Sequence, residues 1–380
     1  MIALSEPLIG DIERKWVDEC LRSNFVSSAG PMVAEFESRF ARMVGSKYAV
    51  ATSSGTAALH VALHSLGIGN GHSVVVPDLT FVASMNPVLY CGARPVLLDI
   101  ERETWCLDLQ LLRDVCGERR GKKSQIKAVI PVHLYGCACD MDELLRIARE
   151  YEFVIIEDAT EALGTTLHGR QAGTFGEAGC FSFNGNKLLT TGAGGIVVTD
   201  SEELAAKIRY LVNQARDNPA IYLHGAMGFN YRMDSLSAAL GIAQMERFNT
   251  ILDLKRRIAE CYKKALDDLP GVQHPPLLAD MTHSYWLYSI VVSNAAYREK
   301  LLASLNGAGI GARPFFQPLH KQPYVNASLW TRDAKGAHRS RNGISDAISA
   351  GGINLPSSAG LTPEDQETVI RTITTSSNSR

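Results

Sequence analysis

One lysine stands apart in the stretch SFNGNKLLTTGAGG, residues 182–195. A surface lysine usually has other charges and helix-forming residues around it, whereas Lys187 is flanked by asparagine, glycine and threonine. A glycine-rich loop can hold an amine in one place, and a held lysine amine can form a Schiff base with a carbonyl group. Lys187 is therefore the first candidate catalytic residue.

Two further turns carry residues that suit a bound ligand. The segment TSSGTAAL, residues 52–59, puts Gly55 and Thr56 where a strand ends and a helix begins. Free backbone N–H groups and the positive end of the helix dipole suit a phosphate there. The segment VIIEDATEALG, residues 154–164, ends an apolar strand in two carboxylates, of which the second, Asp158, needs a cationic or hydrogen-bonding partner. A well-capped helix would also explain the first pattern, and a structural salt bridge or a cap would explain the second.

These residues together match the requirements of pyridoxal phosphate. Gly55 and Thr56 could hold its phosphate, Asp158 could keep a proton on its pyridine nitrogen, and Lys187 could form the Schiff base. Phe81, in the segment PDLTFVAS, could stack on the ring, although packing in the core would also explain it. Each pattern is weak alone, and their order along the chain makes the set specific.

The elements that position these residues alternate between strand-like and helix-like runs from about residue 47 to residue 215. The apolar strands are nearly continuous, as expected when helices cover both faces of a sheet. This pattern predicts an α/β domain with a mostly parallel sheet, and ligands bind at the edge where the strand-to-helix turns of such a sheet gather. The predicted strands are YAVATSS, SVVVPD, PVLLDI, IKAVIPVHLYG and FVIIEDA, and the predicted helices are GTAALHVALHSLG, LTFVASMNPVLY, LDLQLLRDVCG and MDELLRIAREYE.

The last third of the chain has a different pattern. An irregular loop at 215–232 and a long helical pattern from Asp234 to Leu269 precede a strand, YWLYSIVVS, and two helices, AYREKLLASLNGAG and PEDQETVIRTIT. We predict a large domain over residues 1–245 and a smaller α+β domain over residues 246–380.

The composition of the chain argues against several classes of function. The 380 residues carry a formal net charge of -2, and a charge this close to zero does not favour binding to nucleic acid or to an anionic membrane surface. No basic stretch with a following apolar run opens the chain, and no run approaches the roughly 18 apolar residues of a membrane span, so we expect a cytoplasmic protein. The eight cysteines include one close pair, Cys137 and Cys139, with no second pair at metal-ligand spacing, which favours reduced core thiols and no metal site.

The chain resembles the DegT/DnrJ/EryC1/StrS sugar aminotransferases, a family of pyridoxal phosphate enzymes with the type I, aspartate aminotransferase-like fold. The similar segments span almost the whole chain: SSGTAALH, VVPDLTFVAS, PVHLYGCACDMDEL, IIEDATEALGT, GTFGEAGCFSFNGNKLLTTGAGG, FNYRMDSLSAALGIAQMER, ARPFFQPLHKQPYV and GGINLPS. ETW, HSYWLYSIVV and RPFFQPLH are similar to perosamine synthases. SFNGNK is similar to enzymes that make UDP-linked 4-amino sugars of the bacillosamine and legionaminic acid routes.

The resemblance implies roles for the cofactor-binding residues. Lys187 matches the Schiff-base lysine and Asp158 the partner of the pyridine nitrogen. Glu161 matches a position near the phenolic oxygen that often holds glutamine. The other implied cofactor ligands are Phe81 on the ring, Gly55, Thr56 and Ser182 on the phosphate, and Asn230 on the phosphate of the neighbouring subunit, which implies a homodimer with shared active sites.

The resemblance also implies contacts with a sugar nucleotide. They would come from the loop at residues 23–30 and from the segment at residues 313–320. Arg313 could pair with a diphosphate, or it could be a surface arginine packed on an aromatic ring. The implied contact residues are Phe25, Val26, Ser27, Ser28, Arg313, Phe315 and His320, while His133 and Tyr135 are expected to shape the pocket.

The implied reaction transfers an amino group from L-glutamate, by way of pyridoxamine phosphate, to the C4 ketone of a nucleotide-linked 4-keto-6-deoxy sugar, as in the synthesis of lipopolysaccharide O-antigen. One alternative is a pyridoxamine-dependent dehydratase of the same fold, but such enzymes carry histidine where this chain has Lys187. Another is a non-catalytic, aminotransferase-like sensor. A sensor would be expected to add a DNA-binding segment, and the first predicted helix already begins by about residue 9.

Overall fold

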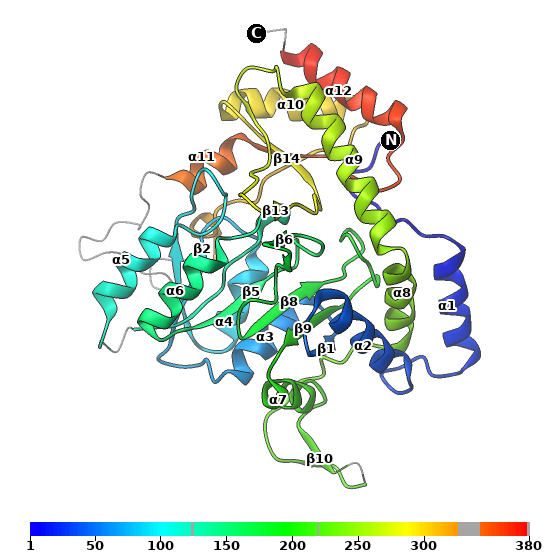
Figure 1. The fold of residues 1–380 in the computed structure, drawn as a ribbon, viewed down its shortest axis with the longest axis vertical. Helices are drawn as coiled ribbons and strands as arrows, with labels where there is room; N and C mark the ends of the chain where they lie inside the picture. The colour runs from blue at the N-terminus through cyan, green and yellow to red at the C-terminus, as the bar shows by residue number, and fades with distance from the viewer. Residues whose placement is uncertain (123–124, 219, 326–342, 378–380) are drawn as a thin grey trace.

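The computed structural model describes residues 1–122, 125–218, 220–325 and 343–377. A seven-stranded sheet lies at its centre, in the order β1-β9-β8-β5-β4-β2-β3 (Figure 1). Six of the seven strands run in one direction and β9 runs in the opposite one, which confirms the prediction of a mostly parallel sheet. Its strands are β1 (Tyr48–Thr52), β2 (Ser73–Pro77), β3 (Arg94–Leu98), β4 (Ile126–Val129), β5 (Val154–Asp158), β8 (Ala178–Ser182) and β9 (Gly195–Thr199).

Helices cover both faces of this sheet, and their apolar residues form the core. One face packs against α3, α4 and α7, and the other packs against α5 and α6 toward one edge and against α2 and α8 toward β1. This covering on two sides explains the continuous apolar strands. The helices are α1 (Asp11–Arg22), α2 (Met32–Val44), α3 (Gly55–Ser65), α4 (Asn86–Tyr90), α5 (Leu109–Arg119), α6 (Met141–Tyr151), α7 (Glu202–Val212) and α8 (Ser235–Glu246).

A smaller antiparallel sheet follows in the chain, in the order β12-β14-β16-β15. All four strands come after residue 246, and the first residues of the chain also pack here. Ile2 pairs with Ile310 in an isolated bridge, and the N-terminus lies beside α12 (Figure 1). The elements are β12 (Val272–Gln273), β14 (Tyr288–Val292), β15 (Arg313–Pro314), β16 (Gly352–Leu355), α9 (Phe248–Leu266), α10 (Ala295–Gly307), α11 (Ile344–Gly351) and α12 (Pro363–Ser377).

Short elements complete the described chain. A three-stranded sheet, β13-β6-β7, joins a segment of the large unit to one that precedes β14. Its strands are β6 (Thr166–Leu167), β7 (Arg170–Gln171) and β13 (Met281–Thr282), and the 3-10 turns are η1 (Val82–Ser84), η2 (Leu134–Gly136) and η3 (Leu319–Lys321).

Three predicted elements are wrong in detail. The helical pattern over 234–269 is two helices, α8 and α9, because Arg247 leaves the helical conformation and its guanidinium pairs with the buried Glu13 of α1. The predicted helix LTFVASMNPVLY is η1 followed by the short α4, since Pro87 fits only the first turn of a helix. The loop at 215–232 contains a hairpin of β10 (Arg216–Asn218) and β11 (Leu223–His224).

Within the described ranges, none of the helices combines the length and the apolar composition that crossing a bilayer would take. The same ranges hold no cluster of histidine, cysteine, aspartate and glutamate that could bind a metal ion. All eight cysteines are free thiols, and six of them, including Cys137 and Cys139, are buried.

Candidate active site

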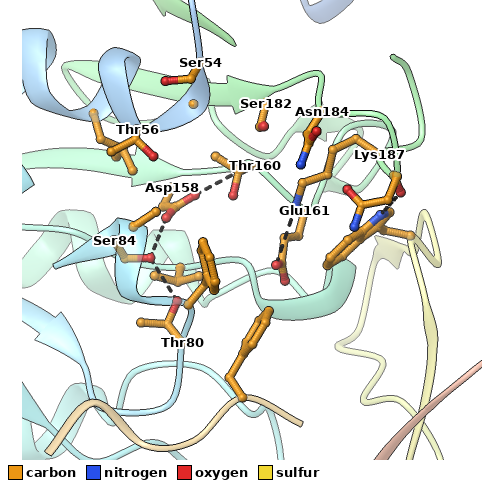
Figure 2. A pocket seen from close by; sticks show the side chains of 18 of the residues that line it. Ser54, Thr56, Thr80, Ser84, Asp158, Thr160, Glu161, Ser182, Asn184 and Lys187 are labelled. Carbon is orange, nitrogen blue, oxygen red and sulfur yellow. Dashed lines mark hydrogen bonds and ion pairs between the residues drawn. The ribbon is translucent and has the colours of Figure 1, made fainter. Parts of the chain in front are cut away.

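A cavity of about 510 Å³ opens where β5, β8 and the start of α3 meet the segments around Trp286 and Phe316. Parallel strands deliver their carboxyl ends to one edge of the sheet, which places the residues that end β5 and β8 side by side. Figure 2 shows the polar side chains of this edge pointing into the cavity. Eight of the predicted site residues line it: Gly55, Thr56, Phe81, Asp158, Glu161, Ser182, Lys187 and Arg313.

The start of α3 forms one end of the cavity. Ser54 caps this helix, because its hydroxyl accepts a hydrogen bond from the backbone N–H of Ala57 at 3.1 Å. A Cβ atom on Gly55 would lie 2.8 Å from Cβ of Ser182, so only glycine lets the helix begin this close to β8. The N–H groups of the first turn and the hydroxyls of Thr56 and Ser182 thus surround a space that suits a phosphate.

Asp158 is buried at the end of β5 and borders the cavity. Its Oδ2 accepts a hydrogen bond from Ser84 Oγ at 2.6 Å, and its Oδ1 accepts one from the Thr160 N–H at 3.2 Å. Ser84 in turn lies 2.9 Å from the hydroxyl of Thr80. These neutral donors orient the carboxylate toward the cavity without neutralising its charge, so the carboxylate can stabilise a positively charged ring nitrogen.

The adjacent carboxylate, Glu157, has a different role. Its two oxygens accept hydrogen bonds from the backbone N–H groups of Gly173, Phe175 and Gly176, and one of them lies 3.0 Å from Nε2 of His133. Both Glu157 and His133 are fully enclosed. This side chain therefore holds the chain after β7 in place and does not contribute to the cavity.

Lys187 lies between a carboxylate and an aromatic ring. Its Nζ is 3.7 Å from Oε1 of Glu161 and 3.7 Å from the ring centroid of Trp286. Burial lowers the pKa of the lysine, although the nearby carboxylates of Glu161 and Asp158 oppose that effect. Burial raises the pKa of Glu161 to about 7, against the opposing effect of the Lys187 charge. Burial thus brings the pKa values of the two groups closer together, which eases proton exchange between them and suits a group that must act as both acid and base.

Aromatic side chains form the opposite wall. Phe81 is 52% exposed and faces the cavity, and its ring lies 5.4 Å from that of Phe316. Tyr135, which has a positive φ of 53°, is buried behind them, stacks against Phe316 and gives its backbone N–H to Glu161. Phe81 is therefore available to stack on a ring in the cavity.

The comparisons with known proteins agree with this geometry. The model of the DegT/DnrJ/EryC1/StrS aminotransferase family matches residues 7–374. The chain belongs to this family. This aminotransferase is 40% identical to GDP-perosamine synthase from Caulobacter vibrioides, over 97% of this chain and 96% of the relative. It is 38% identical to the putative pyridoxal phosphate-dependent aminotransferase EpsN from Bacillus subtilis, over 98% and 95% of the two chains. The putative sugar aminotransferase Spr1654 from Streptococcus pneumoniae, solved in its PMP form, shares 25% identity with a TM-score of 0.91 over 100% of both chains.

The fold is thus that of the type I pyridoxal phosphate enzymes, and pyridoxal 5′-phosphate is the cofactor of this aminotransferase. The cavity fits the cofactor on its own evidence. Gly55 leaves room for a phosphate at the start of α3, Asp158 and Lys187 border the same space, and Phe81 offers a ring face. Oδ1 of Asn186 is a buried acceptor at the cavity that lacks a hydrogen-bond partner within the described chain.

Several predicted residues of the aminotransferase lie outside the cavity of one chain. Phe315 is buried against Trp105 and Tyr135, whereas its neighbour Phe316 lines the cavity. His320 Nδ1 lies 2.6 Å from the buried carboxylate of Asp78, and this contact raises the pKa of the histidine. The other residues outside are the exposed Asn230 and the loop residues Phe25, Val26, Ser27 and Ser28, whose roles stay predictions.

Several residues of the cavity have no role that the sequence motifs predicted. Trp286 lies within the segment HSYWLYSIVV and Phe316 within RPFFQPLH, and both segments supported the resemblance without revealing which aromatic side chains face the site. The hydroxyls beside Asp158 had a weak signal, since Thr80 and Ser84 flank Phe81 at short spacing. The residues missed were Thr80, Ser84, Thr160, Asn184, Asn186, Trp286 and Phe316.

Proposed function

We propose that this aminotransferase converts a nucleotide-linked 4-keto-6-deoxy sugar into its 4-amino sugar with L-glutamate as the amino donor. The observation that carries the proposal is the placement of Lys187 and Asp158 at one cavity, in a chain 40% identical to a GDP-perosamine synthase over nearly its whole length. The identity favours a GDP-linked sugar as the first substrate to test.

Pyridoxal phosphate, when bound, supplies an electron sink that lets a proton leave the carbon next to the transferred nitrogen. Lys187 is the group placed to carry this proton, since its amine borders the cavity and burial lowers its pKa. Asp158 would hold a proton on the ring nitrogen, and Ser84 and Thr160 keep its carboxylate aimed there. The start of α3 would bind the phosphate, and Phe81 would stack on the ring.

The substrate test is direct. The protein is incubated with glutamate and with GDP-, UDP- and dTDP-linked 4-keto-6-deoxy sugars in turn, and the products are identified by mass. We expect one nucleotide series to gain an amino group, with the GDP series as the first candidate. If no member of the panel turns over while the protein retains its cofactor, the substrate class is wrong.

The proposal includes a homodimer in which Asn230 of each chain reaches the cofactor phosphate of the other. Asn230 is exposed, and its backbone forms an isolated bridge with Asn213, so the amide is accessible to a second copy of the chain. One hydrogen bond to a charged acceptor contributes about 1.5–3 kcal/mol, so Asn230→Ala should lose cofactor more readily without unfolding.

Mixing variants tests the sharing. In a hybrid dimer of Lys187→Ala with Asn230→Ala, a shared arrangement puts both defects in one site and leaves the other site intact. Activity recovered on mixing two impaired variants supports sharing. If subunits exchange and no activity returns, Asn230 serves its own chain or no site at all.

We also propose a cytoplasmic enzyme whose product enters lipopolysaccharide O-antigen. The eight free thiols support a reducing compartment, where cysteines stay unpaired. Fractionation of the source cells, with detection of the protein by antibody, tests the location. Loss of the 4-amino sugar from the surface polysaccharide of a deletion strain tests the destination of the product.

A further inference from the structure

Two residues outside the large sheet support Lys187. Trp286, in the segment before β14, contacts the amine of Lys187, and Lys255, on α9, binds the backbone of Trp286. We propose that Trp286, held from behind by Lys255, is a positioning residue that gives the Lys187 amine a fixed resting place whenever the amine is not bonded to the cofactor. The inference rests on the proposed function in one respect, namely that Lys187 is the lysine that bonds to the cofactor.

The first contact is between the amine and the indole ring. Nζ of Lys187 lies 3.7 Å from the ring centroid of Trp286, within the range in which an ammonium group is attracted to the face of an aromatic ring. The charged groups that face this amine are the carboxylates of Glu161, at 3.7 Å, and Asp158. A lysine side chain is a flexible stem of four carbons, so without the ring the free amine could take other positions.

The second contact is between the indole and the backbone beside Lys187. Nε1 of Trp286 donates a hydrogen bond to the carbonyl oxygen of Asn186 at 2.7 Å, and the Ser5 hydroxyl donates to the same oxygen at 2.9 Å. Trp286 is 4% exposed and thus cannot swing into solvent without losing its packing. One side chain therefore holds both the amine of Lys187 and the residue that precedes it.

The third contact fixes Trp286 itself. Lys255, on α9, is buried and donates from its Nζ to the carbonyl oxygen of Trp286 at 2.6 Å and to that of Ser357. Burial lowers the pKa of Lys255 to about 7. Among the described residues, no carboxylate pairs with Lys255. A lysine in that setting is costly to bury, and a methionine of similar shape would pack there without that cost. What the lysine adds is the pair of donors that joins the Trp286 segment to the chain after β16.

The experiment measures the titration of Lys187 by competitive acetylation in the full-length protein freed of cofactor, with the modified peptide quantified by mass. Trp286→Leu removes the ring and the hydrogen bond, while Trp286→Phe keeps a ring face and removes only the hydrogen bond. Because the ring favours the charged amine, we expect Trp286→Leu to lower the pKa of Lys187 by about half a unit to one unit. Trp286→Phe should restore at least half of that shift.

Backbone hydrogen exchange over residues 184–190 gives a second readout. It should quicken in both Trp286 variants and in Lys255→Met, since each weakens the attachment of the Asn186 carbonyl. Trp16→Leu is the matched control, because Trp16 also has a cation over its ring, Arg39, but lies on α1. This control should leave the titration of Lys187 and the exchange of 184–190 unchanged.

Circular dichroism confirms that each variant is folded before it is scored. The proposal is overturned if Lys187 titrates normally in folded Trp286→Leu, or if Trp286→Phe shifts it as far as Trp286→Leu does. The role of Lys255 is overturned if exchange over 184–190 is unchanged in folded Lys255→Met. Since acetylation needs no cofactor, these results stand apart from the mapping of the cofactor lysine, whose failure would instead reject the proposed function.

Discussion

The two walls of the cavity differ in how they are built. One wall comes from the strand ends of the large sheet and carries the polar residues Asp158, Ser182 and Lys187. The other comes from segments beside the smaller sheet and carries Trp286, Arg313 and Phe316. The polar wall comprises the groups that can move protons, whereas the second wall supplies ring faces and one guanidinium. The comparison suggests that the first wall sets the rate of the chemistry and the second sets position and affinity.

The largest effect should come from Lys187, on the polar wall. Borohydride treatment of the holoenzyme should fix the cofactor on Lys187, because reduction converts a Schiff base into a stable secondary amine. Lys187→Ala should form no adduct and lose turnover by several orders of magnitude, in keeping with the loss of both nucleophile and proton carrier. Peptide mapping that finds the adduct on another residue would refute the assignment.

The next effect should come from Asp158. An amide cannot hold a proton on the ring nitrogen, so Asp158→Asn should keep the cofactor and lose at least two orders of magnitude in turnover, or about 3 kcal/mol of transition-state stabilisation. Steady-state kinetics and the cofactor absorbance measure the two parts separately. Glu157→Gln is the matched control, since it should reduce folding stability and leave the cofactor spectrum of the folded protein unchanged. Near-normal turnover in Asp158→Asn would make Asp158 a structural residue.

These two carboxylates also show what the sequence could predict. The segment VIIEDATEALG indicated a carboxylate at the site, and alternation along β5 explains why only Asp158 borders the cavity while Glu157 binds the N–H groups of residues 173–176. The polar wall was predictable because its residues follow strands in short, contiguous motifs. The fold class was predictable for the same reason, since each strand and helix has its own local pattern.

The second wall could not be predicted in this way. Trp286 donates a hydrogen bond to Asn186, which lies 100 residues earlier in the chain. The contact therefore depends on how α9 and the smaller sheet pack against the large sheet. The division of the predicted long helix at Arg247 has the same origin, because its partner Glu13 is 234 residues away. The choice between Phe315 and Phe316 also rests on long-range packing, since Phe315 fills a space beside Trp105.

A smaller effect should come from Glu161, which lies between the walls. Its charge raises the pKa of Lys187, so Glu161→Gln should lower that pKa further, by about one unit. The part of the pH profile of kcat that reports the loss of a proton from Lys187 should therefore move to lower pH. The titration of Glu161 itself, with a pKa of about 7, should disappear from the profile. An unchanged profile would show that the two side chains do not interact in the working enzyme.

The smallest effect should come from Arg313, on the second wall. Its side chain is exposed at the cavity, and no hydrogen bond or ion pair engages its guanidinium within the described ranges, so it is available to a phosphate oxygen of the sugar nucleotide. Arg313→Ala should raise KM for the sugar nucleotide about tenfold, the loss of one charge-assisted hydrogen bond, and should leave kcat and KM for glutamate near their normal values. Arg146→Ala, at an exposed position on α6, controls for the loss of a positive charge. A tenfold fall in kcat at unchanged KM would mean that Arg313 acts in the chemical step, and the division of labour between the two walls would then fail.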